Sequence, residues 1–425
     1  MKEIPKIASK GFARNLKLLK MAYKGGKNLL KNRDDWSKEK LSEVLSSQVH
    51  SLVNDMGLMK GPIMKMGQLL SIYSDGLLPE EFQKVIQQLE NKSFYLSWNE
   101  IKKNIDPNYF DLIEIESTPQ AAASLGQVHK AKIKESNEIV AIKIQYKGVR
   151  KAINNDIKVL KLLLKLSEVV PSEKDYSGLF EEIKTMLYQE TDYRQEKSFT
   201  DKYRDQVSDL NYLYVPKTYE KFCNDKILTT EFIEGVGPRD ILKLELSQDQ
   251  INQLGEQFFD HFFKEIFQWG VIQTDAHAGN YLIRKHENNV QWVLLDFGAC
   301  KEPSEQVREL YRKFIKATVY KDYQSFIDTL IEVGFISAGN EKSYDLIKSY
   351  VDIVGSPFKD EVYDWGKSEI PDQVLKFIPK LIKEFSNDTP PGDNLFIDRK
   401  IGGVFFLLKM INASFNPNKV IEKYI

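Results

Sequence analysis

Two carboxylates and one amide in the second half of the chain have the spacing of a phosphoryl-transfer site. Asp275 and Asn280 lie in the segment TDAHAGN, and Asp296 follows in LLDFGA, after a run of Val and Leu residues that reads as a strand. In kinases with this spacing, the first carboxylate approaches the reacting group, while the amide and the second carboxylate hold Mg²⁺ on the phosphates. The alternative is a chance turn followed by a chance strand end. We expect Asp275 to be catalytic, and Asn280 and Asp296 to be metal ligands.

Lys143, in the segment VAIK, is the residue that we expect to bind the α- and β-phosphates of a nucleotide. It alternates with apolar residues on a predicted strand, so its ammonium group points away from the buried face. In kinases such a lysine pairs with a glutamate on a helix. A lysine that is simply exposed on the sheet is the alternative interpretation.

The segment YQETDYRQEKSF is predicted to be helical and offers more carboxylates than that pairing requires. Its acidic residues are Glu190, Asp192 and Glu196. Asp192 and Glu196 would share one face of the helix, where like charges one turn apart repel. We therefore expect a cation nearby. A solvated acidic helix face is the alternative.

Alanines occupy the loop in which a nucleotide-binding hairpin usually carries glycines. The loop consists of Ala121, Ala122, Ala123 and Ser124. Glycine accepts positive φ and has no Cβ, whereas alanine is excluded from much of that conformational space. We predict a restricted loop, helical at its start, whose amides reach phosphate in one fixed pose. A plain turn of small residues is the alternative.

The elements that must position these residues are predicted as helices over residues 37–92, then a section up to residue 235 that contains strands and two long helices, and then a mostly helical section. The apolar periods predict strands at residues 109–116, 126–133, 138–145, 213–219 and 226–235, and helices at 151–169 and 176–204. A small sheet followed by a larger helical part is an α+β arrangement. Glu231 lies where the last strand ends, and we expect its backbone to contact the nucleotide base. A plain strand end is the alternative for Glu231.

The segment after Gly298 argues against a protein substrate. A helix is predicted to begin near Glu305, only a few residues later, and no APE sequence follows. Protein kinases carry a long activation segment between those points. We therefore expect an ATPase or a kinase of small molecules.

The composition is that of a soluble globular protein. The 425 residues are 42% hydrophobic and 28% charged, which excludes overall disorder. No apolar run approaches the ~20 residues that cross a bilayer. The two cysteines, Cys223 and Cys300, are far apart, so neither a disulfide framework nor a zinc site is expected.

Residues 1–33 are strongly basic and contain a single acidic residue, Glu3. Their apolar residues and lysines have the pattern of an amphipathic helix on an anionic membrane surface. The alternative is a solvated basic helix. Neither a secretory signal nor a transit peptide is indicated. We expect a cytoplasmic protein that is peripheral on a membrane, with an organelle left open and no nucleic-acid partner.

Together these segments resemble the UbiB family of atypical kinases, the AarF-domain proteins that support coenzyme Q biosynthesis. KMGQ, from Lys65 to Gln68, resembles the family's K-x-G-Q helix, AAAS its alanine-rich nucleotide loop, and ETD its E-x-D motif. The segment RKIGGVFFLLKMINA resembles the family's C-terminal helix. The motifs are specific in combination, and the resemblance covers nearly the whole chain.

The resemblance implies a protein-kinase-like bilobal fold with a small antiparallel sheet lobe, a larger helical lobe and an N-terminal helical extension over the cleft. The corresponding domains are 1–95 for the basic segment and the extension with the KMGQ motif, 96–235 for the kinase-like N-lobe and 236–425 for the kinase-like helical C-lobe. ATP and Mg²⁺ are the implied cofactors.

The resemblance also implies roles for single residues. It implies that Lys143 pairs with Glu196, and that Lys65 and Gln68 lie over the cleft near Glu190 and Asp192. The implied function is support of ubiquinone biosynthesis at a membrane surface, with a lipid or quinone precursor as a further ligand. Phosphorylation of other proteins is not expected.

Two alternative functions stay open. The alternatives are a nucleotide-gated protein that binds a lipid or partner with negligible turnover, and an aminoglycoside- or choline-type kinase, a class without the K-x-G-Q and E-x-D helices.

Three residues depart from the common pattern. Gln273 replaces the usual kinase histidine, as in the QTD variant of the coenzyme Q branch. Ala276 and Ala278 replace prolines of many bacterial members, which leaves the loop less rigid.

Overall fold

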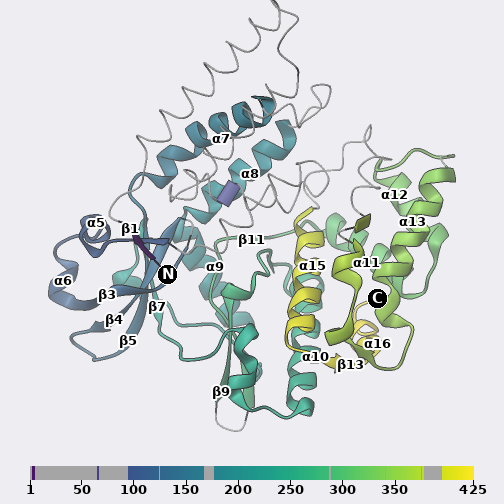
Figure 1. Cartoon of the computed structure of the whole chain (residues 1–425). Coiled ribbons are helices and arrows are strands. Elements are labelled where there is room, and N and C mark those ends of the chain that lie inside the picture. Colours follow the sequence, from purple (N-terminus) through teal and green to yellow (C-terminus); the bar gives the residue numbers. More distant parts are fainter. Residues whose placement is uncertain are drawn as a thin grey trace, which may run out of the picture. The chain divides into compact units, whose positions relative to one another are not determined.

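The computed structural model of the chain (Figure 1) describes most residues from Phe94 onward and two short segments before it. The described residues are 2–4, 65–66, 94–123, 125–166, 177–286, 289–339, 341–374, 376–377 and 395–425. Gln68, Ser124 and most of residues 1–33 lie outside these ranges. The chain forms two compact units. The first unit comprises Met1–Arg194 and Tyr219–Phe232, and the second comprises Gln195–Thr218 and Ile233–Ile425.

A four-stranded antiparallel sheet in the order β3-β4-β5-β7 is the centre of the first unit. Its strands are Ile113–Ala122, Gly126–Ile133, Ile139–Gln145 and Ile227–Glu231. On β5, Val140, Ile142 and Ile144 are buried and alternate with the half-buried Lys143, as the sequence pattern predicts. A further strand, β2 Phe94–Leu96, pairs in parallel with β1 Lys2–Ile4.

The strand predicted at residues 109–116 begins later than expected. Tyr109–Leu112 form the short helix α6, and β3 starts at Ile113. The side chain of Asp106 accepts a hydrogen bond from the amide of Asn108 at 2.9 Å, and the main-chain oxygen of Asp106 accepts from the amide of Tyr109. This local turn starts a helix and overrides the strand preference of the aromatic residues that follow.

Besides α6, the α-helices of the first unit include α5 Trp98–Ile101, α7 Val149–Leu166 and α8 Ser177–Glu190. The single helix predicted at residues 176–204 is wrong, because α8 ends at Glu190 and a separate helix, α9 Tyr193–Gln206, follows. The break lies at Thr191, whose carbonyl oxygen accepts a hydrogen bond from Gln145 of the sheet at 2.9 Å instead of one from the next helical turn. The boundary between the two units falls in the first turn of α9.

The strands of the second unit are short and flank the loops of chemical interest. β9 Tyr281–His286 and β10 Asn289–Leu294 form an antiparallel hairpin, and β6 Leu213–Tyr214 pairs in parallel with β10. Two further antiparallel pairs are β8 Ile272–Gln273 with β11 Cys300–Lys301, and β12 Tyr363–Asp364 with β13 Ser414–Phe415. β8 and β10 each end two residues before one of the candidate acidic residues, Asp275 and Asp296.

Helices form most of the second unit (Figure 1). Besides most of α9, they include η3 Pro238–Leu244, α10 Gln248–Lys264, its π-helical continuation Glu265–Trp269, α11 Glu305–Val319, α12 Tyr323–Glu332, α13 Glu341–Val354, α15 Leu395–Met410 and α16 Pro417–Ile421. α11 begins at Glu305, as predicted. α10 begins with a capping box between Ser247 and Gln250.

The inner face of α10 belongs to an aromatic core. Phe258 and Phe259 are buried there, with Trp292 of β10 and Trp365. Rings of this size remove large apolar areas from water, and this burial holds the helices around α10. None of the described helices combines the length and the apolar character needed to cross a bilayer. The antiparallel sheet and the helical second unit confirm the predicted α+β class.

His261 on α10 is buried among these aromatic rings, with its side chain 1% exposed. Within the described part of the chain, neither ring nitrogen has a hydrogen-bond partner. Burial, with the ammonium groups of Lys400 and Lys264 as further causes, holds the pKa of His261 well below its ordinary 6.5. As the pH falls through 6.5, this ring therefore stays neutral in the folded chain, whereas it takes up a proton in the unfolded chain.

We predict that His261 makes the free energy of unfolding depend on pH. This contribution to the free energy of unfolding is present above pH 6.5 and is lost as the pH falls, with an upper limit of about 2 kcal/mol at pH 5. Urea unfolding of the wild type and of His261→Leu at pH 7 and pH 5 tests this. The free energy of unfolding should fall more between the two pH values in the wild type than in the variant. An equal loss of stability in both proteins would contradict the prediction.

Candidate functional site

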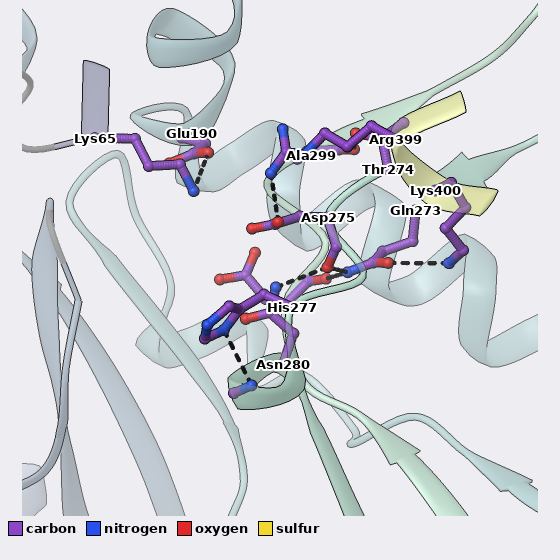
Figure 2. A network of polar contacts seen from close by, with 12 residues as sticks. Lys65, Glu190, Gln273, Thr274, Asp275, His277, Asn280, Ala299, Arg399 and Lys400 are labelled. Atoms are coloured by element: carbon purple, nitrogen blue, oxygen red, sulfur yellow. Dashed lines mark hydrogen bonds and ion pairs between the residues drawn. The ribbon is translucent and has the colours of Figure 1, made fainter. Parts of the chain in front are cut away.

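The loops after β8 and β10 bring Asp275, Asn280 and Asp296 together in the second unit. Asp275 follows β8, Asn280 ends the 3₁₀ turn Ala278–Asn280, and Asp296 follows β10. The Asn280 amide group donates to the main-chain oxygen of Asp275 at 3.0 Å, and the Leu295 amide donates to the main-chain oxygen of Asn280 at 3.0 Å. Direct hydrogen bonds thus connect the segments that carry the three sequence-predicted residues, of which Figure 2 shows Asp275 and Asn280.

The side chain of Gln273 connects the loops of Asp275 and Asp296. Its Nε2 donates to the main-chain oxygens of Asp275 at 2.9 Å and Asp296 at 3.2 Å. Its Oε1 accepts from the hydroxyl of Tyr281 at 2.8 Å and from Lys400 Nζ at 3.2 Å. Sequence reasoning treated Gln273 as a departure from the kinase histidine. The structure gives it a defined task, which is to bridge the loops of Asp275 and Asp296.

Two basic residues on α15, Arg399 and Lys400, reach this region (Figure 2). Arg399 donates to Asp275 Oδ1 at 2.5 Å, and the side chains are 10% and 17% exposed. Lys400 forms an ion pair with Glu265 at 2.9 Å, and neither side chain has any exposure. Sequence reasoning missed all three of these residues. The available signal was a basic pair at the start of an otherwise apolar helix, LFIDRKIGGVFFLLKM.

The buried pair belongs to a larger set of hydrogen bonds. Glu265 Oε1 accepts from the hydroxyl of Tyr203 at 2.8 Å and from the amide of Gln273 at 3.1 Å. Burial raises the pKa of Glu265, although Lys400 opposes that effect. Burial also raises the pKa of Tyr203 and Tyr281 well above the ordinary value, so both hydroxyls stay protonated and can donate.

α15 approaches the loop of Asp275 closely at a glycine. A Cβ added to Gly403 would lie 2.4 Å from the Cβ of Ala276, a distance that real side chains do not adopt. The neighbouring Gly402 faces open space and would accept a Cβ without contact. Ala276, which sequence reasoning took to leave the loop less rigid, is therefore packed against a helix and is 7% exposed.

Glu196 lies near the turn that follows Asp296. It is on α9 and is 1% exposed. A Cβ built on Gly298 would lie 3.3 Å from Asp296 Oδ1 and 3.5 Å from Glu196 Oε2, so both carboxylates border this glycine. The amide of Gly298 donates to Asp296 Oδ1 at 2.9 Å. Lys143, its expected partner, is in the first unit, where its ammonium group lies 5.3 Å from the ring centre of Tyr193.

The carboxylates of the ETD motif have separate cations within the first unit. Lys65 Nζ lies 2.8 Å from Glu190 Oε1, with both side chains mostly buried (Figure 2). Arg150 lies 3.7 Å from Asp192, and this pair is largely exposed. The expected repulsion between Asp192 and Glu196 on one helix face is wrong, because Asp192 lies in the break before α9.

The alanine loop is extended rather than helical at its start. Ala121 and Ala122 are the last residues of β3 and pair with Val128 and Gln127, and the amide of Ala123 donates to the main-chain oxygen of Gly126 at 2.9 Å. Pairing with β4 therefore overrides the helix preference of alanine. Glu231 ends β7 opposite Val140.

The donors around the Asp296 turn suit a magnesium ion. An amide oxygen and a carboxylate are the oxygen ligands that Mg²⁺ prefers, and this ion commonly uses one or two protein ligands with phosphate oxygens and water. Asn280 and Asp296 supply that set. Across the residues that the structure describes, no group of three or more His, Cys, Asp or Glu side chains converges as a metal site.

Comparison with known proteins gives consistent matches. Residues 85–330 match the family described as the ABC1 atypical kinase-like domain. The atypical kinase COQ8, mitochondrial, of Saccharomyces cerevisiae is 27% identical over 404 residues, which cover 92% of this chain and 78% of that protein. The atypical kinase COQ8B, mitochondrial, of Rattus norvegicus is 29% identical over 374 residues, which cover 85% of this chain and 69% of that protein.

A solved structure has the same fold. It is the complex of Rv3197 with erythromycin from Mycobacterium tuberculosis, and it matches with a TM-score of 0.60 at 23% sequence identity. The match covers 92% of this chain and 98% of that one.

The glycine pair on α15 yields a prediction with opposite signs at adjacent positions. Gly403→Ala should lower the free energy of unfolding by about 1–3 kcal/mol, because the new methyl group collides with Ala276. Gly402→Ala should raise it by about 0.5–1 kcal/mol, since alanine restricts the unfolded chain and favours helix. Denaturant unfolding of both variants checks this, and equal effects at the two positions would contradict the close approach.

Proposed function

Because the chain belongs to the ABC1 atypical kinase-like family, we propose that it binds Mg·ATP and supports ubiquinone biosynthesis at a membrane surface. The family match confirms the resemblance to UbiB atypical kinases and the kinase-like phosphotransferase or ATPase class. The family and the solved structure also confirm the kinase-like α+β fold. The nucleotide, the metal, the membrane surface and the quinone link are the proposed parts.

One observation carries the proposal: the loops of Asp275, Asn280 and Asp296 are tied to one another by hydrogen bonds. We assign Asp275 to accept the proton of the attacking hydroxyl or water, and Asn280 and Asp296 to hold the metal. Bound Mg²⁺ would neutralise negative charge on the phosphates. Arg399 orients the Asp275 carboxylate through their ion pair.

We assign nucleotide binding mainly to residues of the first unit. Lys143 would bind the α- and β-phosphates and pair with Glu196, as in other kinases. The amides of Ala121, Ala122, Ala123 and Ser124, and the backbone of Glu231, would contact the nucleotide. The extended pairing of the first two alanines supports a loop with one fixed pose.

The KMGQ and ETD motifs are proposed to restrain the nucleotide site. Lys65 and Gln68 would lie near Glu190 and Asp192, and the ion pair of Lys65 with Glu190 supports that assignment. The corresponding domain boundaries remain residues 1–95, 96–235 and 236–425.

The substrate is proposed to be small or lipidic. α11 begins at Glu305, soon after Asp296, so the chain has no room for a long activation segment there. A quinone precursor or other lipid would then be presented at an anionic membrane surface, with residues 1–33 as the attachment. The cytoplasmic location remains a prediction, and the names of both curated relatives place those proteins in mitochondria.

A nucleotide-gated protein that binds a lipid or partner with negligible turnover is the second candidate. The contact of Arg399 with Asp275 favours it, because the carboxylate that would act as base is already engaged. The two candidates differ in turnover and not in nucleotide binding.

We expect purified protein to release phosphate from Mg·ATP, and Asp296→Asn to lower kcat by at least about 100-fold through loss of a metal ligand. Asp328→Asn, an exposed carboxylate on α12, is the matched control and should keep wild-type turnover. Measurements with and without vesicles of anionic lipid test the membrane surface. Turnover that persists in Asp296→Asn would contradict the assignment, whereas nucleotide binding without turnover would favour the gated binder.

The two cations of the ETD motif should differ in their effect on stability. Lys65→Ala should lower the free energy of unfolding by about 1–3 kcal/mol, because it leaves the mostly buried Glu190 without this cation. Arg150→Ala should cost less than about 1 kcal/mol, since its pair with Asp192 is largely exposed. Lys65→Ala should also change the Kd of Mg·ATP, measured by calorimetry. Unchanged stability and affinity would contradict the placement of Lys65.

A further inference from the structure

A buried cluster of polar side chains lies against the loops of Asp275 and Asp296, and the roles proposed above use only its Gln273. Its members are Lys400, Glu265, Gln273, Tyr203 and Tyr281, and each is 2% exposed or less. Moving two charges out of water is costly, so stability alone rarely explains a fully buried ion pair. The contacts of Lys400 and Glu265 with Gln273 give a different reason.

The amide of Gln273 is the point where the cluster meets the loops. Its NH₂ group faces two carbonyl oxygens, and its oxygen faces the Tyr281 hydroxyl and the Lys400 ammonium group. Turning the amide by half a rotation would set its oxygen against the two carbonyls and its NH₂ group against the ammonium group. Lys400 therefore selects one orientation, since an ammonium group can donate hydrogen bonds but cannot accept them.

Glu265 binds the main-chain amide of Gln273. One carboxylate oxygen accepts from the Gln273 amide at 3.1 Å, and the other lies 2.9 Å from Lys400 Nζ. The ion pair thus fixes both the backbone and the side chain of one residue. Glu265 also begins the π-helical turn that follows α10, and such turns are frequent at functional sites.

We propose that Lys400 and Glu265 are positioning residues for phosphoryl transfer, which lock the Gln273 amide so that it holds the loops of Asp275 and Asp296 in one arrangement. This inference rests on the proposed function, because it assigns what the cluster does for that site. Lys400 and Glu265 act through Gln273.

The test replaces the ion pair by neutral side chains of similar shape in the full chain, Lys400→Met with Glu265→Gln. The matched control is Lys264→Met with Asp260→Asn, an ion pair on α10 whose further hydrogen bonds go to Tyr212, Tyr424 and Lys423, not to the two loops. Three experiments are done on each protein: thermal melting, steady-state kinetics that give kcat and KM for Mg·ATP, and hydrogen–deuterium exchange of the amides in residues 274–280 and 295–298.

We expect the Lys400/Glu265 double variant to stay folded, and its loop amides to exchange about tenfold faster, which corresponds to ~1.4 kcal/mol. Its kcat should fall by about tenfold while KM changes little, because the lost contacts set the geometry of the reaction and not the affinity for nucleotide. The control variant should keep wild-type exchange in both loops. A role in stability alone would lower the melting temperature and leave kcat and exchange in the folded protein unchanged.

Wild-type exchange and kcat in the folded double variant would overturn the proposal. If the double variant does not melt cooperatively, Glu265→Gln with Asp260→Asn as its control takes its place, and unchanged loop exchange there overturns the proposal equally. If the wild type shows no Asp296-dependent turnover, the proposed function fails. Exchange in the same variants still decides whether Lys400 and Glu265 position the loops.

Discussion

The side-chain amide of Gln273 links the two loops on which the proposed site depends, alongside the main-chain hydrogen bond from Leu295 to Asn280. The two loops that carry Asp275 and Asp296 follow different strands, and nothing in the local sequence fixes their separation. The amide of Gln273 bonds to the main chain of both. Because this bridge is buried, water does not compete for its hydrogen bonds, and the arrangement of the two loops depends on how firmly that amide is held.

The helix α15 supplies the support for this bridge. It brings Lys400 to the Gln273 amide and Arg399 to the Asp275 carboxylate, and it packs against Ala276 where Gly403 has no side chain. One helix thus touches the Asp275 loop through an ion pair, a packed glycine and a buried ammonium group. A helix that is mostly apolar can carry these two charges only because Glu265 and Asp275 compensate them.

In the first unit, the break between α8 and α9 places the carboxylates of Glu190 and Asp192 beside different cations. Thr191 turns its carbonyl to Gln145 of the sheet, and the chain leaves α8 at Glu190. Glu190 and Asp192 consequently face different cations, Lys65 and Arg150. The repulsion expected between carboxylates one helical turn apart does not arise, because Asp192 has not yet entered α9.

The sequence by itself determined the class of the fold, the family and the residues that have the types needed for phosphoryl transfer. Spacing sufficed there, since Asp275, Asn280 and Asp296 have the separations of a phosphoryl-transfer site along the chain and an apolar run predicts the strand before Asp296. Only the tertiary structure decided which residues support them. Lys400 and Gln273 are 127 positions apart, and burial and pairing at that range depend on how the whole second unit packs. The extended alanines and the break at Thr191 likewise result from contacts with other strands, which override local preference.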